Sequence, residues 1–482
     1  MIDIVKSLAK LPFTELMELY GPEENVDSFY RYLQDVFFCT PEARYCLWRE
    51  DGKLVSALRI EPYQDGYLLN GLQTHPEHRN KGYASHLMLM ALSYMSKPVY
   101  SHIHPKNPAS VAVHEKCGFQ KIKDTAVLLD GTVTSNMGTY VNKCFMNTKE
   151  TLDSLMEQGR FDRYALFVRH GGLKSVFTGG NVDLDTCFEV ASLTKVTVTA
   201  PLALMAVREG KLRLDERLGD IFPDLTEMAD ATVFQLMTHS SGIGGVPFSF
   251  ELTDQGSFHV ATKICQAKPN YQPGTAVEYS CMGFITLGAI LEQRYGMKLD
   301  ELFEEKIVKP LGLTRSRFCM PLGEENTAVC YRREFDRAYA VDDENAYFMR
   351  GVSGNAGAFW SIDDLHLLAE AIWNKTLYGS ELAELAEQGY TEGMAQNRGL
   401  GYLMIDENDP LSGGLFTKGS FGHCGYTGTS MFFNREKQVY VLLLTNCARF
   451  AYREAPNHEH VRGRALEVRS RIHSAIKDDL NI

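Results

Sequence analysis

Ser192 and Lys195 are the two residues of this chain whose types and spacing point most directly to chemistry. They lie in the segment Phe188-Glu189-Val190-Ala191-Ser192-Leu193-Thr194-Lys195. If Ser192 begins a helix, Lys195 lies nearly one turn later on the same face, where its amine can approach the serine hydroxyl. A serine attacks a carbonyl only when a base takes its proton, and a lysine can be that base only if burial or a nearby cation lowers its pKa. The pair therefore predicts a nucleophile beside its base.

A second cluster, residues 272–281, supports this interpretation, because Ser-x-x-Lys alone is weak and occurs twice more in the chain. A Pro-Gly pair predicts a turn, and Ser280 predicts the N-cap of a helix over 281–295. Tyr279 then lies at the junction of loop and helix, from which its side chain can project into a cleft. A buried core tyrosine is the alternative.

A third cluster, residues 419–430, surrounds His423 with glycines. Glycines let a substrate lie against a strand, and strand N–H groups can complete an oxyanion site. The cluster leads into a predicted hairpin with strands over 431–433 and 439–444. His239 is another candidate base, but a hydrogen-bonded structural histidine is the simpler interpretation, because the serine and lysine already supply a nucleophile with its base.

A buried helix must carry Ser192. The pattern predicts that this helix runs to Glu209, although a β-branched run and Pro201 are poor helix formers, so burial has to hold it. Further strands are predicted over 164–168 and 175–178, where they form a hairpin.

Residues 66–119 carry a second candidate site. A strand leads into a turn that contains Gly82 and then into an apolar helix over 85–95. Backbone N–H groups at such a helix start have no partner inside the helix and can hold a pyrophosphate, and Arg79 and Lys81 add positive charge. Four histidines of this region have a spacing that fits no strong metal-ligand signature, so surface histidines are the simpler interpretation.

This N-terminal region resembles the GNAT acetyltransferases over roughly residues 1–130. The segment Arg79-Asn80-Lys81-Gly82-Tyr83-Ala84 is similar to their acetyl-CoA pyrophosphate loop, and Val113-His114-Glu115-Lys116-Cys117-Gly118-Phe119 is similar to the segment that closes their cofactor cleft. The resemblance implies that acetyl-CoA is bound by Arg79, Asn80, Lys81, Gly82, Tyr83, Ala84 and Asn107. His114 stands where the family usually has the tyrosine that protonates the departing thiolate, so it is the candidate acid of acetyl transfer. A retained fold with a structural or regulatory role is the alternative.

Taken in order, the three clusters of the C-terminal region resemble the penicillin-recognising serine hydrolases: class C β-lactamases, serine D-alanyl-D-alanine peptidases and related esterases. The resemblance covers about residues 150–450. It implies that Ser192 is the acylated nucleophile, Lys195 its activating partner, and Tyr279 a phenolic acid and base whose pKa Lys195 lowers. The backbone N–H groups of Ser192 and Tyr426 would hold the oxyanion.

Two residues depart from the pattern of that family. Cys281 stands where the family often has asparagine, so the amide that orients a substrate amide is missing. The family has a lysine or a histidine, then any residue, then a glycine. Here His423 and Gly425 stand at these positions, and a histidine is only partly charged at neutral pH. Both changes favour a relaxed esterase, amidase or D-peptidase over a true β-lactamase or wall peptidase. Cys281 and Gly425 are the expected substrate-binding residues, and His423 completes the catalytic set.

The composition limits the class of protein and its partners. The 482 residues predict two domains, and 44% hydrophobic with 23% charged residues indicate a soluble globular protein. A formal net charge of -12 gives no broad basic surface, which argues against nucleic acid as a partner. The first residues lack the features of a secretory signal, no apolar run is long enough for a membrane span, and the eleven cysteines are scattered as reduced thiols would be. We therefore expect a cytoplasmic protein with no membrane partner.

The expected architecture has two domains, of α/β and α+β class. Residues 1–145 form a GNAT-like domain with a mixed sheet, and residues 146–160 form a polar helical linker. Residues 161–482 form a β-lactamase-like or transpeptidase-like domain with an antiparallel sheet covered on both faces by helices.

The expected function is that of a serine hydrolase that forms a covalent acyl-enzyme at Ser192 and is fused to an acetyl-CoA-binding domain. Its substrate would be a small ester, amide or peptide, and the hydrolase domain would use neither a cofactor nor a metal. One alternative is an acetyl-CoA-dependent N-acetyltransferase whose C-terminal domain only binds substrate or acts as a sensor. Another is a sensor in which neither domain turns over a substrate. The sequence leaves the oligomeric state open.

Overall fold

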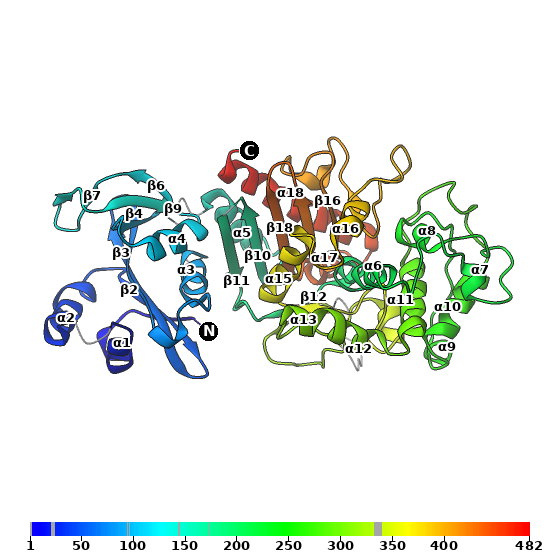
Figure 1. The fold of residues 1–482 in the computed structure, drawn as a ribbon, viewed down its shortest axis with the longest axis horizontal. Helices are drawn as coiled ribbons and strands as arrows, with labels where there is room; N and C mark the ends of the chain where they lie inside the picture. The colour runs from blue at the N-terminus through cyan, green and yellow to red at the C-terminus, as the bar shows by residue number, and fades with distance from the viewer. Residues whose placement is uncertain are drawn as a thin grey trace. The chain divides into compact units, whose positions relative to one another are not determined.

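The structure is a computed structural model and describes residues 2–20, 25–93, 95, 97–142, 145–171, 173–331 and 340–482. The chain divides into two compact units, each of which is described by itself (Figure 1). One unit is Met1–Glu150 with Val168–Phe177, and the other is Thr151–Phe167 with Thr178–Ile482. The domain boundaries that the sequence suggests remain a prediction.

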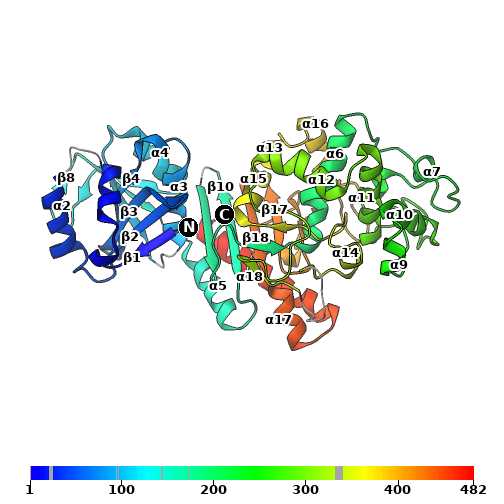
Figure 2. The same ribbon diagram turned by 90° about the horizontal axis from the view of Figure 1, so that it is seen from below.

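A seven-stranded mixed sheet organises the first unit, in the order β1-β2-β3-β4-β5-β9-β6 (Figure 2). Strands β4 and β5 run parallel, and the other neighbours run antiparallel. The strands are β1 (Ile2–Val5), β2 (Arg44–Glu50), β3 (Lys53–Tyr63), β4 (Gly66–Thr74), β5 (Val99–Ile103), β6 (Gln120–Lys123) and β9 (Gly138–Asn142). A separate two-stranded sheet consists of β7 (Ala126–Val127) and β8 (Val133–Thr134). The mixed sheet confirms the predicted class of this domain.

Helix α3 (Tyr83–Ser93) packs on this sheet and begins close to the end of β4. Its residues Leu87 and Met88 share one apolar core with Leu58 and Val99 of the sheet. The remaining helices of this region are α1 (Phe13–Tyr20), α2 (Val26–Tyr32), α4 (Pro108–Lys116) and α5 (Met146–Glu157), which lies where the sequence predicts a polar helical linker.

Four neighbouring strands of the second unit, β18, β17, β16 and β15, pair antiparallel, and they belong to a six-stranded sheet in the order β11-β10-β18-β17-β16-β15. Its strands are β10 (Tyr164–His170), β11 (Leu173–Gly179), β15 (Leu403–Met404), β16 (Phe421–Cys424), β17 (Ser430–Asn434) and β18 (Val439–Thr445). A smaller sheet consists of β12 (Cys187–Glu189), β13 (Thr327–Ala328) and β14 (Phe359–Trp360). The predicted hairpins over 164–178 and 431–444 are therefore present as β10-β11 and β17-β18.

Helices make up most of the rest of the second unit. They are α6 (Ala200–Arg208), α7 (Leu218–Ile221), α8 (Val233–Met237), α9 (Phe250–Thr253), α10 (Ser257–Gln266), α11 (Cys281–Tyr295), α12 (Leu299–Phe303), α13 (Lys309–Leu311), α14 (Glu344–Phe348), α15 (Ile362–Trp373), α16 (Ser380–Ala386), α17 (Cys447–Glu454) and α18 (His458–Leu480). Across the described ranges, no helix has both the length and the apolar character that a membrane span requires.

Helices α15 and α18 cover opposite faces of the six-stranded sheet. Successive side chains of a strand point to opposite faces, so Phe432 and Phe433 of β17 mark the two sides. Phe432 packs against His473 of α18, with ring centroids 6.2 Å apart, whereas Phe433 packs against Trp373 of α15 at 6.4 Å. This arrangement confirms the predicted antiparallel sheet with helices on both faces.

The segment that carries Ser192 differs from the continuous helix that the sequence predicts. It runs as a 3-10 turn over Ala191–Leu193, a π-helical turn over Lys195–Thr199 and the α-helix α6. The wider turn lies directly before Pro201, which has no N–H group to continue an α-helical ladder. The residues from 195 to 206 are all buried, as expected for a helix that burial holds in place.

Helix α11 begins and ends as predicted. The Ser280 side chain accepts a hydrogen bond from the backbone N–H of Met282, and Gly296 ends the helix in the left-handed conformation, with a φ of 67°. The residue before the cap, Tyr279, is therefore fixed at the start of this helix.

Candidate active site

The structure brings Ser192, Lys195 and Tyr279 together, although Tyr279 is 87 positions further along the chain than the serine. The Lys195 Nζ donates to Ser192 Oγ at 2.9 Å, and the Tyr279 hydroxyl donates to the same oxygen at 2.7 Å. Ala191, directly before the serine, has a φ of 46°, a conformation that L-residues rarely adopt and that often occurs at functional sites. The predicted nucleophile, lysine and phenol thus lie within hydrogen-bonding reach of one another.

Lys195 is fully buried and its three N–H groups all have acceptors. Besides Ser192 Oγ, its Nζ donates to the carbonyl oxygen of Asn355 at 3.0 Å and to Cys281 Sγ at 3.6 Å. Burial pulls the pKa of Lys195 down, but Cys281, Tyr279 and Asp343 outweigh it and raise the pKa above its ordinary value. Lys195 is therefore an ammonium at neutral pH, and the sequence-based expectation of a lowered lysine pKa is wrong.

The ring of Tyr279 packs against the imidazoles of His239 and His423, with ring centroids at 4.7 and 5.7 Å. Lys195 Nζ and the Arg398 guanidinium lie over the same ring, 5.0 and 5.3 Å from its centroid. Burial raises the pKa of Tyr279 above its ordinary value, and the opposing effect of Lys195 does not offset it. Lys195 thus acts on the pKa of Tyr279 in the expected direction, but burial outweighs it, and Tyr279 is a neutral phenol at rest.

His423 lies in the cleft beside Tyr279, but as a neutral side chain. Burial, together with Arg398 and Lys195 nearby, holds the pKa of His423 well below its ordinary value. Its Nδ1 lies 2.8 Å from the carbonyl oxygen of Cys424, which can only accept, so Nδ1 carries the proton and Nε2 carries a lone pair. The expectation of a partly charged His423 is therefore wrong.

His239 lies behind Tyr279. Its Nδ1 accepts a hydrogen bond from the backbone N–H of Ser280 at 3.1 Å, so it helps to fix the start of α11. Burial, Arg398 and Lys195 hold the pKa of His239 well below its ordinary value. This geometry agrees with a hydrogen-bonded structural histidine.

Gly425 lies at a close approach between the turn after β16 and the segment before Ser192. A Cβ at this position would lie 2.1 Å from Thr429 Oγ1 and 2.2 Å from the carbonyl oxygen of Val190. Its backbone N–H donates to the Thr429 carbonyl at 2.8 Å, and its carbonyl accepts a hydrogen bond from Arg469. Both backbone groups of Gly425 are thus used within the protein, so its lack of a side chain serves packing rather than a substrate hydrogen bond.

Two hollows open at Ser192 and share four residues in their walls, which are Ser192, Tyr279, Tyr426 and Arg462. The larger has a volume of about 470 Å³, and it also contacts His423, Gly425, Arg398 and Arg469. The smaller has a volume of about 230 Å³, and it also contacts Cys281, Asp342, Asp343 and Glu344. Tyr426, a predicted oxyanion residue, and Cys281, a free thiol, therefore both line the cleft at the serine.

Arg398 and Arg469 are lining residues that the sequence interpretation missed. Arg469 lies on α18, and Arg398 lies in the loop before β15. Neither residue has a spacing relation to Ser192 in the sequence. The local signal is that Arg398 directly precedes the segment Gly399-Leu400-Gly401.

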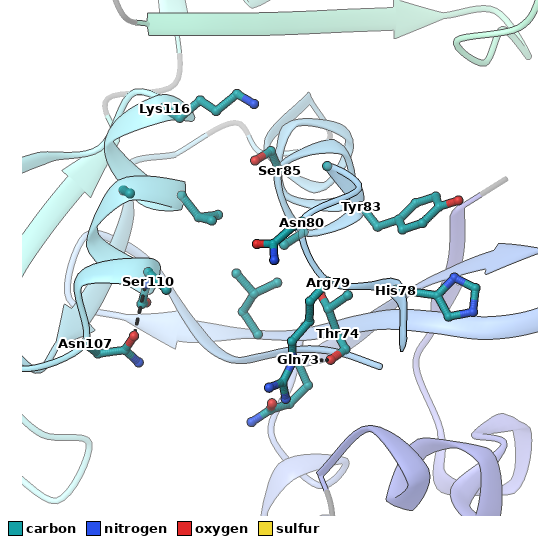
Figure 3. A pocket seen from close by; sticks show the side chains of 16 residues that line it. Gln73, Thr74, His78, Arg79, Asn80, Tyr83, Ser85, Asn107, Ser110 and Lys116 are labelled. Carbon is teal, nitrogen blue, oxygen red and sulfur yellow. Dashed lines mark hydrogen bonds between the residues drawn. The ribbon is translucent and has the colours of Figure 1, made fainter. Parts of the chain in front are cut away.

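A third hollow, of about 560 Å³, lies in the first unit between the end of β4, the start of α3 and helix α4. Figure 3 shows Asn107, Ser110 and Lys116 on the α4 side and Asn80 and Ser85 on the α3 side. Six of the predicted acetyl-CoA residues line it, namely Arg79, Asn80, Gly82, Tyr83, Ala84 and Asn107. The seventh, Lys81, is not among the lining residues.

His114 is not part of this hollow. Its Nε2 lies 3.0 Å from Ser101 Oγ, and its Nδ1 lies 2.8 Å from the carbonyl oxygen of Ser110. Burial lowers the pKa of His114, so the side chain is neutral at pH 7. The role of His114 as the acid of acetyl transfer stays a prediction. Within the described residues no group of three or more possible ligands could hold a metal.

A serine that opens to a cleft, with a lysine and a tyrosine bonded to it beside an antiparallel sheet, defines the class of the penicillin-binding and β-lactamase serine hydrolases. The family model described as Beta-lactamase matches residues 148–463, well over half of the chain, and the chain belongs to this family. A second family model, Acetyltransferase (GNAT) family, matches residues 11–119, so the N-terminal region is a GNAT domain.

Similar proteins point to the same class. A predicted D-alanyl-D-alanine carboxypeptidase of Escherichia coli (strain K12) is 27% identical over 299 residues, which cover 54% of this chain and 69% of that protein. An N-acetylmuramyl-L-alanine amidase of Bacillus subtilis (strain 168) is 25% identical over 303 residues, which cover 54% of this chain and 68% of the relative. A penicillin-binding protein homologue from Caulobacter crescentus shares the fold, with a TM-score of 0.54 and 19% identity over 70% of this chain and 97% of its own.

Proposed function

We propose that the second unit hydrolyses a small ester, amide or peptide through a covalent ester on Ser192. The observation that carries this proposal is that Ser192 Oγ accepts hydrogen bonds from both Lys195 and Tyr279 at the wall of an open cleft. Once Tyr279 has lost its proton, this arrangement provides a nucleophile with a proton acceptor and a fixed positive charge in one place.

The proposed first step forms a bond between Ser192 Oγ and the substrate carbonyl carbon and breaks the bond from that carbon to the leaving oxygen or nitrogen. Tyr279, as a phenolate, accepts the serine proton and then donates it to the leaving group. Lys195 keeps its proton and stabilises the phenolate by its charge. Water then attacks the ester, Tyr279 takes a proton from that water, and the serine oxygen regains a proton as the free acid leaves.

Two further residues have proposed supporting roles. The backbone N–H groups of Ser192 and Tyr426 would hold the negative oxygen of the tetrahedral intermediate. His423, which is neutral, would accept a hydrogen bond from a substrate N–H or O–H group at Nε2, because that atom is buried and has no partner among the described residues.

The test is intact-mass spectrometry after exposure to a fluorophosphonate, which reacts with activated serines. The wild-type protein is expected to gain one adduct, and the Ser192→Ala variant is expected to gain none. Cys281→Ala is the matched control, because its thiol lies beside Lys195. The variant lacks this thiol and is still expected to gain one adduct. An unmodified wild type, or an adduct that persists in Ser192→Ala, would overturn the proposal.

We further propose that the first unit binds acetyl-CoA in its hollow, with Arg79, Gly82 and Asn107 among the residues that hold it. Asn80 and Gly82 have φ values of 64° and 88°, and a Cβ at Gly82 would have no atom within 4 Å, so the loop leaves room at the start of α3. Backbone N–H groups at a helix start suit a pyrophosphate. Bound acetyl-CoA would supply an activated acetyl thioester, and its use would favour a cytoplasmic location.

Acetyl transfer by the first unit is the second candidate function, and the fit of six predicted residues around one hollow favours it. It predicts thiol release from acetyl-CoA in the presence of an amine substrate, at a rate that Ser192→Ala does not change. A rate that falls to background in Ser192→Ala would contradict a separate acetyltransferase.

A further inference from the structure

Arg59 is a half-buried cation of the first unit and lies on β3. Its guanidinium carbon lies 5.5 Å from the centre of the Phe29 ring and 5.3 Å from the centre of the Tyr32 ring, and the centres of these two rings are 6.5 Å apart. Its Nε is buried without a partner, and across the described ranges Arg59 forms neither a hydrogen bond nor an ion pair. Two aromatic rings therefore fix a guanidinium whose donors the protein does not use.

Arg59 keeps its charge at this place. Burial acts to lower its pKa, but neighbouring groups outweigh burial and raise the pKa above its ordinary value, namely Tyr45, Tyr20, Tyr32 and Glu61. A charge that is partly removed from water is costly unless an opposite charge or hydrogen bonds compensate it. A carboxylate from outside the chain would supply both.

Gly71 leaves the room that Arg59 needs. Strand β4 bulges here against β3, and Gly71 has a φ of 58°. A Cβ at this position would lie 2.8 Å from Arg59 Nε and 2.9 Å from the Tyr20 hydroxyl, so a side chain would displace both. The Nε of Arg59 therefore lies against the backbone of β4, and its two Nη atoms are the ones left for a ligand.

Glu61 supplies a negative charge on the same side of the sheet. Because Arg59 and Glu61 are two residues apart on β3, both point to one face, roughly 7 Å from each other along the strand. Glu61 is 3% exposed, and it accepts hydrogen bonds from Asn70 Nδ2 at 3.0 Å and from the Tyr32 hydroxyl at 3.5 Å. A carboxylate can accept more than two hydrogen bonds, so Glu61 can also accept one from a ligand ammonium.

This cluster adjoins the hollow proposed for acetyl-CoA. Arg59 lies on the face of the sheet that α1 covers, since Ala57, two residues before it, shares a core with Leu16 of α1. On β4, Asn70 belongs to the cluster, and Leu72, two residues further on, lines the hollow. Two residues of a strand span roughly 7 Å, so a molecule bound at Arg59 and Glu61 lies close to that hollow.

We propose that Arg59 and Glu61 bind a small amine that carries a carboxylate, such as an amino acid, and that this amine is the acceptor of the acetyl group. The carboxylate binds the Nη atoms of Arg59, and the ammonium binds Glu61. The amine nitrogen forms a bond to the acetyl carbon while the bond from that carbon to sulfur breaks. One of the two protons that the nitrogen loses passes to Glu61, and the other passes to the departing sulfur. This inference rests on the proposed acetyl transfer by the first unit.

The test compares acceptors that differ in one charge. Amino acids with aliphatic, aromatic, acidic and basic side chains are each paired with their C-terminal amides, and the release of CoA from acetyl-CoA is followed by chromatography. Every assay uses the Ser192→Ala background, so that the second unit does not hydrolyse the amides. In at least one pair the amino acid is expected to exceed its amide at least about tenfold in kcat/KM.

Substitution of Arg59 should remove that preference. Arg59→Gln is expected to lower kcat/KM for the preferred amino acid at least about tenfold and for its amide no more than about threefold, because only the acid loses a charge partner. Arg59→Lys should recover part of the loss because it keeps the charge. Arg44→Gln is the matched control, since Arg44 also lies over a tyrosine ring, 5.3 Å from the centre of Tyr67, but donates to the carbonyl oxygen of Glu42 at 3.2 Å.

Binding is measured separately and without acetyl-CoA. Saturation-transfer NMR of the full chain with the same amino acids and amides should detect at least one amino acid more strongly than its amide. Arg59→Gln should remove this difference, and Arg44→Gln should leave it unchanged.

Two results would overturn the inference. One is a chain that prefers no amino acid over its amide, in transfer or in binding, and the other is an equal loss for both members of a pair in Arg59→Gln. If that variant does not fold, competition in the wild type decides, because 3-phenylpropanoate must then displace the bound amino acid better than 3-phenylpropanamide. A chain that binds amino acids through Arg59 yet acetylates no amine would instead reject the proposed acetyl transfer, which keeps the two failures apart.

Discussion

Ser192 Oγ accepts hydrogen bonds from an ammonium and from a phenol, and this pair sets the chemistry at the residue scale. Burial penalises the charged form of both partners. It therefore acts to lower the pKa of Lys195 and to raise the pKa of Tyr279. Lys195 stays charged since three acceptors and nearby groups support its ammonium, whereas Tyr279 stays neutral. The reactive form of the site, with Tyr279 as a phenolate, therefore has one proton fewer than its resting form.

The rate of serine acylation should rise with pH through the neutral range. The phenolate of Tyr279 is the proposed base, and a pKa above the ordinary value of a phenol means that its fraction grows about tenfold per pH unit at neutral pH. His239 and His423 are not expected to add a step near pH 6.5, because burial and nearby cations hold their pKa values well below the ordinary value. The measurement is kcat/KM for p-nitrophenyl pentanoate, corrected for spontaneous hydrolysis, from pH 5.5 to 9 in steps of about half a unit.

The expected profile rises steadily and has no step near pH 6.5. A step near pH 6.5 that disappears in His423→Asn would show that this histidine titrates in the working range. That result would contradict the neutral state of His423 in the resting cleft.

At the scale of elements, the turn after β16 has to approach the segment before Ser192 closely. Gly425 makes this possible, because the carbonyl oxygen of Val190 and the hydroxyl of Thr429 occupy the space that a side chain would need. The same turn is held from the other side by Arg469 of α18, which donates to the carbonyl oxygens of Gly425 and Thr429. The turn after β16, helix α18 and the segment before Ser192 therefore meet at Gly425.

Gly425→Ala should destabilise the second unit by roughly 1–3 kcal/mol, the usual cost of adding a methylene group to a tightly packed site. The added Cβ would lie 2.2 Å from a backbone oxygen, which cannot rotate away as the end of a side chain could. The measurement is urea unfolding of the variant and the wild type, followed by the rate of fluorophosphonate labelling. Gly463→Ala on α18 is the control, since a Cβ there would meet no atom within 4 Å, and a Gly425→Ala variant as stable as this control would contradict the steric argument.

At the scale of the whole molecule, the chain combines two units that each carry a hollow of their own. The one in the first unit contacts Asn80, Gly82 and the start of α3, and the larger one in the second unit contacts Ser192 and Arg398. Because the two sites use different residues, a change in one is expected to leave the chemistry of the other intact.

Gly82→Val should weaken acetyl-CoA binding at least about tenfold in isothermal titration calorimetry, while labelling of Ser192 stays unchanged. A β-branched residue is strained at a φ of 88°, so the loop must move away from the start of α3. Gly131→Val is the matched control, because Gly131 has a φ of 82°, equally open surroundings and no place in the lining of the hollow. Equal binding by both variants would contradict the role of the loop.

Motifs and local patterns in the sequence indicate the two kinds of domain and the residues that meet at the nucleophile. They give the bounds of α11 from Ser280 and Gly296, because capping and left-handed helix ends depend on local backbone chemistry. They also indicate which segments form the hairpins of the large sheet, because alternation and turn residues act over a few positions. Ser192, Lys195 and Tyr279 could be named together because their motifs, taken in order, resemble those of the penicillin-recognising serine hydrolases.

The charge states and the free donors of the site depend on the tertiary structure. The charges of Lys195, Tyr279 and His423 depend on how fully distant segments bury them, and His114 faces the interior because of what packs around α4. Arg398 has only a weak local signal, its place directly before Gly399, since its lack of a counter-ion among the described residues depends on every element around it. Burial and counter-charges come from residues far apart in the chain, so no local pattern of residues can encode them.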